Sequence, residues 1–262
     1  MMTISGLRGR LALLAFFPAI ALADANDDFQ ALLDEAWEWQ LASEPMLASR
    51  LGDRRFNQAW RDDSLDAVEA RHLARRGFLR QLLKIDGSAL SEANKLNYEL
   101  FRRELTGSIE RQRFGGQLLP FSHRGGIQNL ESRADLLRFD TADDYRDWLA
   151  RMTQVDALVE QTIALAEAGI EAGLTAPRAL MERVPAQLEV QLVDEPADSP
   201  FFAIFAALPE SLTPTQREEL RGDALDTIDA VVLPAYRRLA TWLSLIHISE
   251  PTRPFTLSRM PS

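Results

Sequence analysis

The segment whose residue types best suit ligand binding is Ser122-His123-Arg124-Gly125-Gly126-Ile127-Gln128. A histidine and an arginine side by side can bind a carboxylate, and neighbouring glycines let the backbone approach a ligand closely. The alternative interpretation is a glycine-rich turn with solvent-exposed polar side chains, because position in a loop does not establish a function. The sequence leaves both interpretations open.

Other motifs with a known chemical mechanism are missing. The sequence has no P-loop, no G-x-G-x-x-G, no G-x-S-x-G and no H-E-x-x-H. It has no cysteine, which excludes disulfides. Of the three histidines, His72 falls on the apolar face of an expected helix and His247 lies in the C-terminal tail. We therefore assign no catalytic residue, no metal ligand and no cofactor within this chain.

The charge balance excludes one class of partner. The chain has 29 Lys and Arg against 39 Asp and Glu, a formal net charge of −10. Nucleic-acid binding depends on clustered cations that neutralise phosphates. We therefore expect no nucleic-acid partner, and the acidic surface favours solubility.

The N-terminus has the pattern of a secretory signal. Arg8 and Arg10 precede an apolar stretch over residues 11–20, and Ala21-Leu22-Ala23 is a typical cleavage site. The apolar stretch is too short for a membrane span, which needs about 20 apolar residues. We expect residues 1–23 to be removed, leaving a secreted, periplasmic protein without a membrane anchor.

The C-terminus, residues 243–262, resembles the translation of a DNA-library adapter. Residues 243–253 and 258–262 back-translate in one frame, and in the right order, to two segments of such an adapter. We expect residues 243–262 to be an artefact and the natural protein to continue past Trp242. Residues 24–242 then form the family-derived part of the chain.

Hydrophobic spacing in residues 24–242 is helical nearly throughout, so we predict an all-α fold. Helices are expected to begin after Ser64, Ser91, Thr141 and Thr213 as N-caps. The predicted buried faces include Trp37 in the first helix; Leu65, Leu79, Leu82 and Leu83 in the second; and Leu96, Leu100, Phe101 and Leu105 in the third. The tryptophans are interpreted as mainly core residues.

The remaining elements are predicted from the same spacing. Residues 107–139 are expected to form a long ordered loop, and one helix is expected from Thr141 past Ile163. A further helix is predicted over residues 178–193, and a last one through Tyr236 with a kink at Pro234.

The order and spacing of several short segments resemble the N-terminal part of the bacterial domain-of-unknown-function family numbered 885. The segments are Trp39-Gln40-Leu41 with Pro45, Leu51-Gly52-Asp53-Arg54-Arg55-Phe56-Asn57, Leu96-Asn97-Tyr98-Glu99-Leu100-Phe101, Arg124-Gly125-Gly126-Ile127-Gln128, Tyr145-Arg146-Asp147-Trp148-Leu149, Gly173 with Pro177-Arg178, Ser199-Pro200-Phe201, and Leu233-Pro234-Ala235-Tyr236-Arg237-Arg238-Leu239.

The resemblance implies a helical, zincin-like architecture related to carboxypeptidase Taq. It also implies a zinc motif, His-Glu-x-x-Pro-Gly-His-His, in a C-terminal part that this chain does not contain. The implied function is that of an exported zinc-dependent peptidase-like hydrolase acting on a peptide-like substrate, with this chain inactive alone and forming one wall of the substrate channel. The candidate wall contacts are His123, Arg124, Gln128 and Arg178. The alternative is a non-catalytic periplasmic helical binding or scaffold protein.

Overall fold

The computed structural model describes residues 24–122, 125–174, 176–177 and 181–249. Over these residues the chain forms helices joined by turns and contains no strand, which confirms the predicted all-α class. None of the described helices is long and apolar enough to cross a lipid bilayer.

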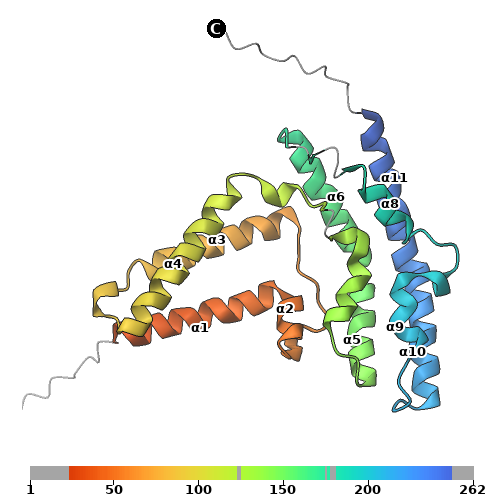
Figure 1. Cartoon of the computed structure of the whole chain (residues 1–262), viewed down its shortest axis with the longest axis horizontal. Helices are drawn as coiled ribbons and strands as arrows, with labels where there is room; N and C mark the ends of the chain where they lie inside the picture. Colours follow the sequence, from red (N-terminus) through yellow and green to blue (C-terminus); the bar gives the residue numbers. More distant parts are fainter. Residues whose placement is uncertain (1–23, 123–124, 175, 178–180, 250–262) are drawn as a thin grey trace, which may run out of the picture.

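The first part of the chain forms an N-terminal lobe of three long helices (Figure 1). α3 (Leu65–Leu82) and α4 (Glu92–Gln112) form an antiparallel hairpin, and α1 (Ala25–Ser43) packs against both. Their apolar faces enclose a separate small core. Its buried members are Phe29, Leu32, Ala36, Phe78, Leu82, Leu90 and Leu105.

Local sequence signals place the starts of these helices. The Ser64 side chain accepts a hydrogen bond from the amide of Ala67, and that of Ser91 from the amide of Asn94. Both confirm the predicted N-caps, which satisfy amide groups that lack a partner within the helix. The predicted end of α4 before Gly107 is wrong, because one glycine inside a helix costs only about 1 kcal/mol.

The predicted loop over residues 107–139 is consequently much shorter. Its first residues belong to α4, and two 3-10 helices, η3 (Gly116–Leu118) and η4 (Ile127–Leu136), form within it. The long irregular segment is therefore mostly ordered helix and turn.

The predicted buried faces of the N-terminal lobe are wrong in part. Leu96 and Leu100 of α4 are 63% and 57% exposed, whereas Tyr98 and Phe101 pack against the core around Leu105. Phe101 and Leu105 thus confirm part of the predicted face. Tyr98 contacts the core where Leu96 and Leu100 were expected, because tertiary packing chooses among apolar positions of similar helical spacing. Three further predicted core residues, Trp37, Leu65 and Leu83, are also exposed.

The rest of the chain forms a larger C-terminal lobe around a second core (Figure 1). Its helices are α5 (Ala142–Met152), α6 (Val155–Glu171), α8 (Val184–Glu189), α9 (Ala203–Ala206), α10 (Pro214–Thr227) and α11 (Leu233–Ser249). The short 3-10 helices η5 (Pro196–Asp198) and η6 (Pro200–Phe202) connect α8 to α9. Fully buried Trp148, Phe201 and Tyr236 are among the largest side chains in this core.

Several element boundaries in this lobe differ from the prediction. The single helix expected from Thr141 is divided into α5 and α6 at Thr153 and Gln154. Within the helix expected over residues 178–193, residues 178–180 lie outside the described part, and the described helix α8 ends at Glu189. A π-helix, η7 (Ile228–Val232), ends two residues before Pro234. Proline removes a regular helical hydrogen bond, which favours the wider π-helical turn before it. The kink at Pro234 itself stays a prediction.

α2 (Pro45–Arg50) and η1 (Arg54–Phe56) join the two lobes by contacts with α5. Arg151 of α5 donates from Nε to the carbonyl of Ala59 at 3.0 Å and from Nη2 to Oγ of Ser49 at 2.7 Å. The indole of Trp60 donates in return to the carbonyl of Arg151 at 2.8 Å. Arg54 forms ion pairs nearby with Asp144 and Asp147. These contacts hold in place the segment of the chain that leads from α2 to α3.

Candidate functional site

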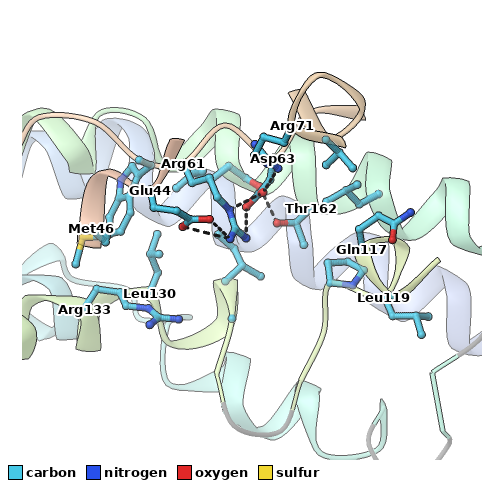
Figure 2. A pocket seen from close by; sticks show the side chains of 18 of the residues that line it. Glu44, Met46, Arg61, Asp63, Arg71, Gln117, Leu119, Leu130, Arg133 and Thr162 are labelled. Carbon is cyan, nitrogen blue, oxygen red and sulfur yellow. Dashed lines mark hydrogen bonds and ion pairs between the residues drawn. The ribbon is translucent and has the colours of Figure 1, made fainter. Parts of the chain in front are cut away.

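A cleft of about 560 Å³ lies between the two lobes, which is within the usual size range of small-ligand sites. One wall comes from α2, residues 60–63 and α3, and the other from η3, η4 and α6 (Figure 2). The charged lining residues are Glu44, Arg61, Asp63, Arg71, Arg75 and Arg133.

Both carboxylates of the cleft are already bound to arginines. Asp63 accepts from Arg61 through both carboxylate oxygens, at 2.8 and 3.0 Å, and from Arg71 at 3.0 Å. Glu44 accepts from Nη1 of Arg61 at 3.2 Å. Figure 2 shows Arg61 held between these two acids. Burial opposes the charge of Arg61, but these acids hold its pKa above the ordinary value.

Arg75 has no such partner among the described residues. It lies one helical turn after Arg71 on α3, is partly buried, and makes no ion pair or hydrogen bond within the part of the chain that the structure covers. Its guanidinium carbon lies 5.5 Å from the centre of the Trp39 ring. Burial and then the neighbouring charge of Arg71 lower the pKa of Arg75 below its ordinary value. An uncompensated cation therefore points to an anionic ligand in this cleft.

The opposite wall adds a second unpaired cation and an apolar surface. Arg133 of η4 is exposed and makes no ion pair with any residue that the structure describes. In Figure 2 it comes from below the cleft, next to Leu130 and facing Glu44 and Arg61. The apolar lining includes Leu119, Leu158 and Leu165. The cleft thus combines donors for an anion with surface for apolar groups.

A glutamine of α6 holds the charged segment in place. The amide of Asp63 donates to Oε1 of Gln161 at 2.9 Å, and Nε2 of Gln161 donates to Asp62 at 3.0 Å. These two hydrogen bonds anchor the segment before α3 to the other lobe. The backbone that carries the Arg61 and Asp63 side chains is therefore held in place against α6.

The floor near η3 depends on a glycine. A Cβ atom at Gly169 of α6 would lie 2.4 Å from the carbonyl oxygen of Leu118. Such an approach is possible only for a residue without a side chain, so Gly169 brings η3 directly onto α6. The adjoining residues Gln117 and Leu119 then line the cleft.

Of the four wall contacts predicted from the sequence, His123, Arg124 and Arg178 lie outside the described residues. Gln128 is 1% exposed. Its Nε2 donates to the carbonyl of Ser122 at 2.6 Å and to Oε1 of Gln187 at 3.2 Å. Its neighbour Ile127 lines the cleft, and a substrate contact by Gln128 itself stays a prediction.

The sequence interpretation overlooked the arginines of the cleft. Arg71 and Arg75 have the i, i+4 spacing that places both on one face of a helix. This spacing could have signalled a paired cationic site, but it is equally typical of a solvent-exposed helix face. The neighbouring aspartates Asp62 and Asp63 serve as partners of glutamine and arginine, respectively.

The residues present do not fit a zinc ion. No group of three or more His, Cys, Asp or Glu side chains in the described parts of the chain could hold a metal. His72 is partly buried within α3. No metal-dependent step can therefore be derived from these residues.

A model of a protein family matches most of the chain. The family is described as bacterial protein of unknown function (DUF885), and the matched residues are 45–253. The match begins at α2, includes every residue that lines the cleft except Glu44, and ends beyond α11. No curated protein that was compared with the chain matches it.

Proposed function

Since the chain belongs to the DUF885 family of bacterial proteins of unknown function, we propose that it forms a substrate-binding part of an exported, zinc-dependent peptidase-like hydrolase. In this proposal the cleft between the lobes binds a peptide-like substrate. The zinc ligands and the catalytic step belong to the part of the parent protein that carries the expected His-Glu-x-x-Pro-Gly-His-His motif.

The composition of the cleft is the observation that supports this proposal. A peptide presents amide groups that need hydrogen-bond partners and side chains that favour apolar contacts. The cleft offers the polar side chains of Gln112, Gln117 and Thr162 beside its arginines, and apolar surface from Leu130 and Leu158. Its position between two lobes is typical of ligand sites.

The test uses the complete product of the native gene, purified from the periplasmic fraction. We expect the protein to begin at Asp24, to contain one zinc ion per chain, and to hydrolyse members of a peptide library. Removing zinc with a chelator should abolish hydrolysis and adding zinc should restore it. Peptide binding without zinc and without hydrolysis would instead favour the non-catalytic binding protein.

A cleft-filling variant tests whether this site binds the peptide. Leu119→Trp places a bulky ring at the cleft wall and is expected to raise KM at least tenfold. Leu83→Trp is the matched control, because Leu83 is 60% exposed and lies outside the cleft lining. Equal KM values for both variants and the unmodified enzyme would contradict a role of the cleft.

A further inference from the structure

The cleft contains more cationic groups than its own carboxylates compensate. Its lining has four arginines against Glu44 and Asp63, although the chain as a whole carries a net charge of −10. Arg61 and Arg71 are ion-paired with these acids. Arg75 and Arg133 make no ion pair within the described part of the chain, so the excess charge belongs to them.

Arg75 is the better placed of the two for ligand binding. It is partly buried, whereas Arg133 is exposed, and its position over the Trp39 ring restrains its guanidinium. Arg61, Arg71 and Arg111 are the cations that act on it, and Glu44 is the acid. A cation in such surroundings gains more from an added anion than a solvated cation does, because a lower dielectric strengthens the attraction.

The guanidinium group also limits the shape of the anion. Its planar arrangement of N–H donors matches the two oxygens of a carboxylate. We propose that Arg75 is a specificity-determining residue that binds a carboxylate of the peptide-like ligand, with Arg133 contributing attraction from the opposite wall. This inference rests on the proposed function and adds that the cleft prefers ligands with a negative charge.

Fluorescence anisotropy of the full chain with N-terminally labelled peptides tests the proposal. Tetra-alanine with a free C-terminal carboxylate is compared with its C-terminal amide and with an amidated peptide that contains one aspartate. We expect a carboxylate peptide to bind about tenfold more tightly than the uncharged amide, the effect of one charge-assisted hydrogen-bonded pair. The two charged peptides distinguish a free C-terminus from an acidic side chain as the source of the carboxylate.

Variants then assign the effect to Arg75. Arg75→Gln should remove the preference for the carboxylate, and Arg75→Lys should keep part of it, because lysine retains the charge but not the planar donor pair. Arg133→Gln should reduce the preference by a smaller factor. Arg76→Gln is the matched control, since Arg76 is exposed on α3 and does not line the cleft. Circular dichroism verifies the fold of each variant.

The outcomes separate this proposal from the proposed function. Equal binding of charged and amidated peptides, or a preference unchanged in Arg75→Gln, would overturn the carboxylate site and leave the peptide cleft intact. Failure of every peptide to bind would overturn both. Inorganic phosphate that binds more tightly than any carboxylate peptide and is lost in Arg75→Gln would also overturn it, because it would show a phosphate site.

Discussion

At the scale of single residues, Arg151 is the most buried cation among the described residues. It is 1% exposed and its hydrogen bonds go to neutral oxygens of Ser49, Phe56 and Ala59. Burial lowers its pKa to about 10, so the group stays charged at neutral pH. Arg151 therefore acts as a connector between α5 and the segment that leads into the cleft.

Removing this connector should destabilise the protein. Arg151→Ala leaves buried carbonyl groups without a donor and creates a cavity, with an expected loss of about 3 kcal/mol in the free energy of unfolding. Urea unfolding followed by circular dichroism measures it. Arg146→Ala on the same helix removes only an exposed ion pair with Asp143 and should cost less than about 1 kcal/mol. Similar losses for both variants would show that Arg151 is not a structural connector.

Glu131 of η4 predicts a dependence of stability on pH. Burial raises the pKa of this carboxyl above 4.5, although Gln191 donates a hydrogen bond to it at 2.7 Å. A carboxyl whose pKa is raised on folding destabilises the folded state at pH values at which it is ionised. Glu131→Gln should therefore stabilise the protein at pH 7.

The stability difference between Glu131→Gln and the unmodified protein should become smaller as the pH falls through the raised pKa of Glu131. Below that pKa the carboxyl of the unmodified protein is neutral, so replacing it with an amide removes no buried charge. Thermal unfolding at pH 7 and at pH 4 measures the difference. Glu189→Gln on α8 is the control, since Glu189 is exposed. A gain of equal size at both pH values would contradict the electrostatic explanation.

At the scale of elements, the start of α10 shows how local sequence determines a helix. Thr213 accepts from the amide of Gln216 at 3.2 Å, and Gln216 accepts from the amide of Thr213 at 3.0 Å. Pro214 occupies the first helical position, where its missing N–H is not needed. This capping box confirms the predicted helix start.

Thr213→Ala should destabilise the protein by about 1 kcal/mol, because an N-cap satisfies amide groups that lack another partner. Thr215→Ala is the matched control: Thr215 is exposed, two residues further along, and its hydroxyl makes no hydrogen bond with the described residues. It should change stability by less than about 0.5 kcal/mol. Urea unfolding compares the two variants, and a larger loss for Thr215→Ala would rule out the capping role.

At the scale of the whole molecule, two separate cores determine where the cleft lies. The N-terminal core of α1, α3 and α4 and the C-terminal core are enclosed separately. The cleft forms where the two lobes meet, and hydrogen bonds of Gln161 and Arg151 join the lobes. Leu243 belongs to the C-terminal core at 2% exposure, and the predicted origin of residues 243–262 stays a prediction.

The sequence by itself determined the features that depend on interactions between residues close together along the chain. The helical class, the N-caps Ser64, Ser91 and Thr213, and the capping box between Thr141 and Asp144 follow from interactions within four residues along the chain. The family also follows from sequence, because it is expressed in the order and spacing of short segments.

Only the tertiary structure decided which helix faces are buried and where the arginines meet. The α4 sequence offers more apolar positions than one face can bury, and packing against α1 and α3 partly buries Tyr98 while Leu96 stays exposed. Arg71 and Arg75 look in sequence like an ordinary solvated face. They become a candidate site because η4 and α6, from distant parts of the chain, form the opposite wall, and contacts between distant segments leave no local pattern in the sequence.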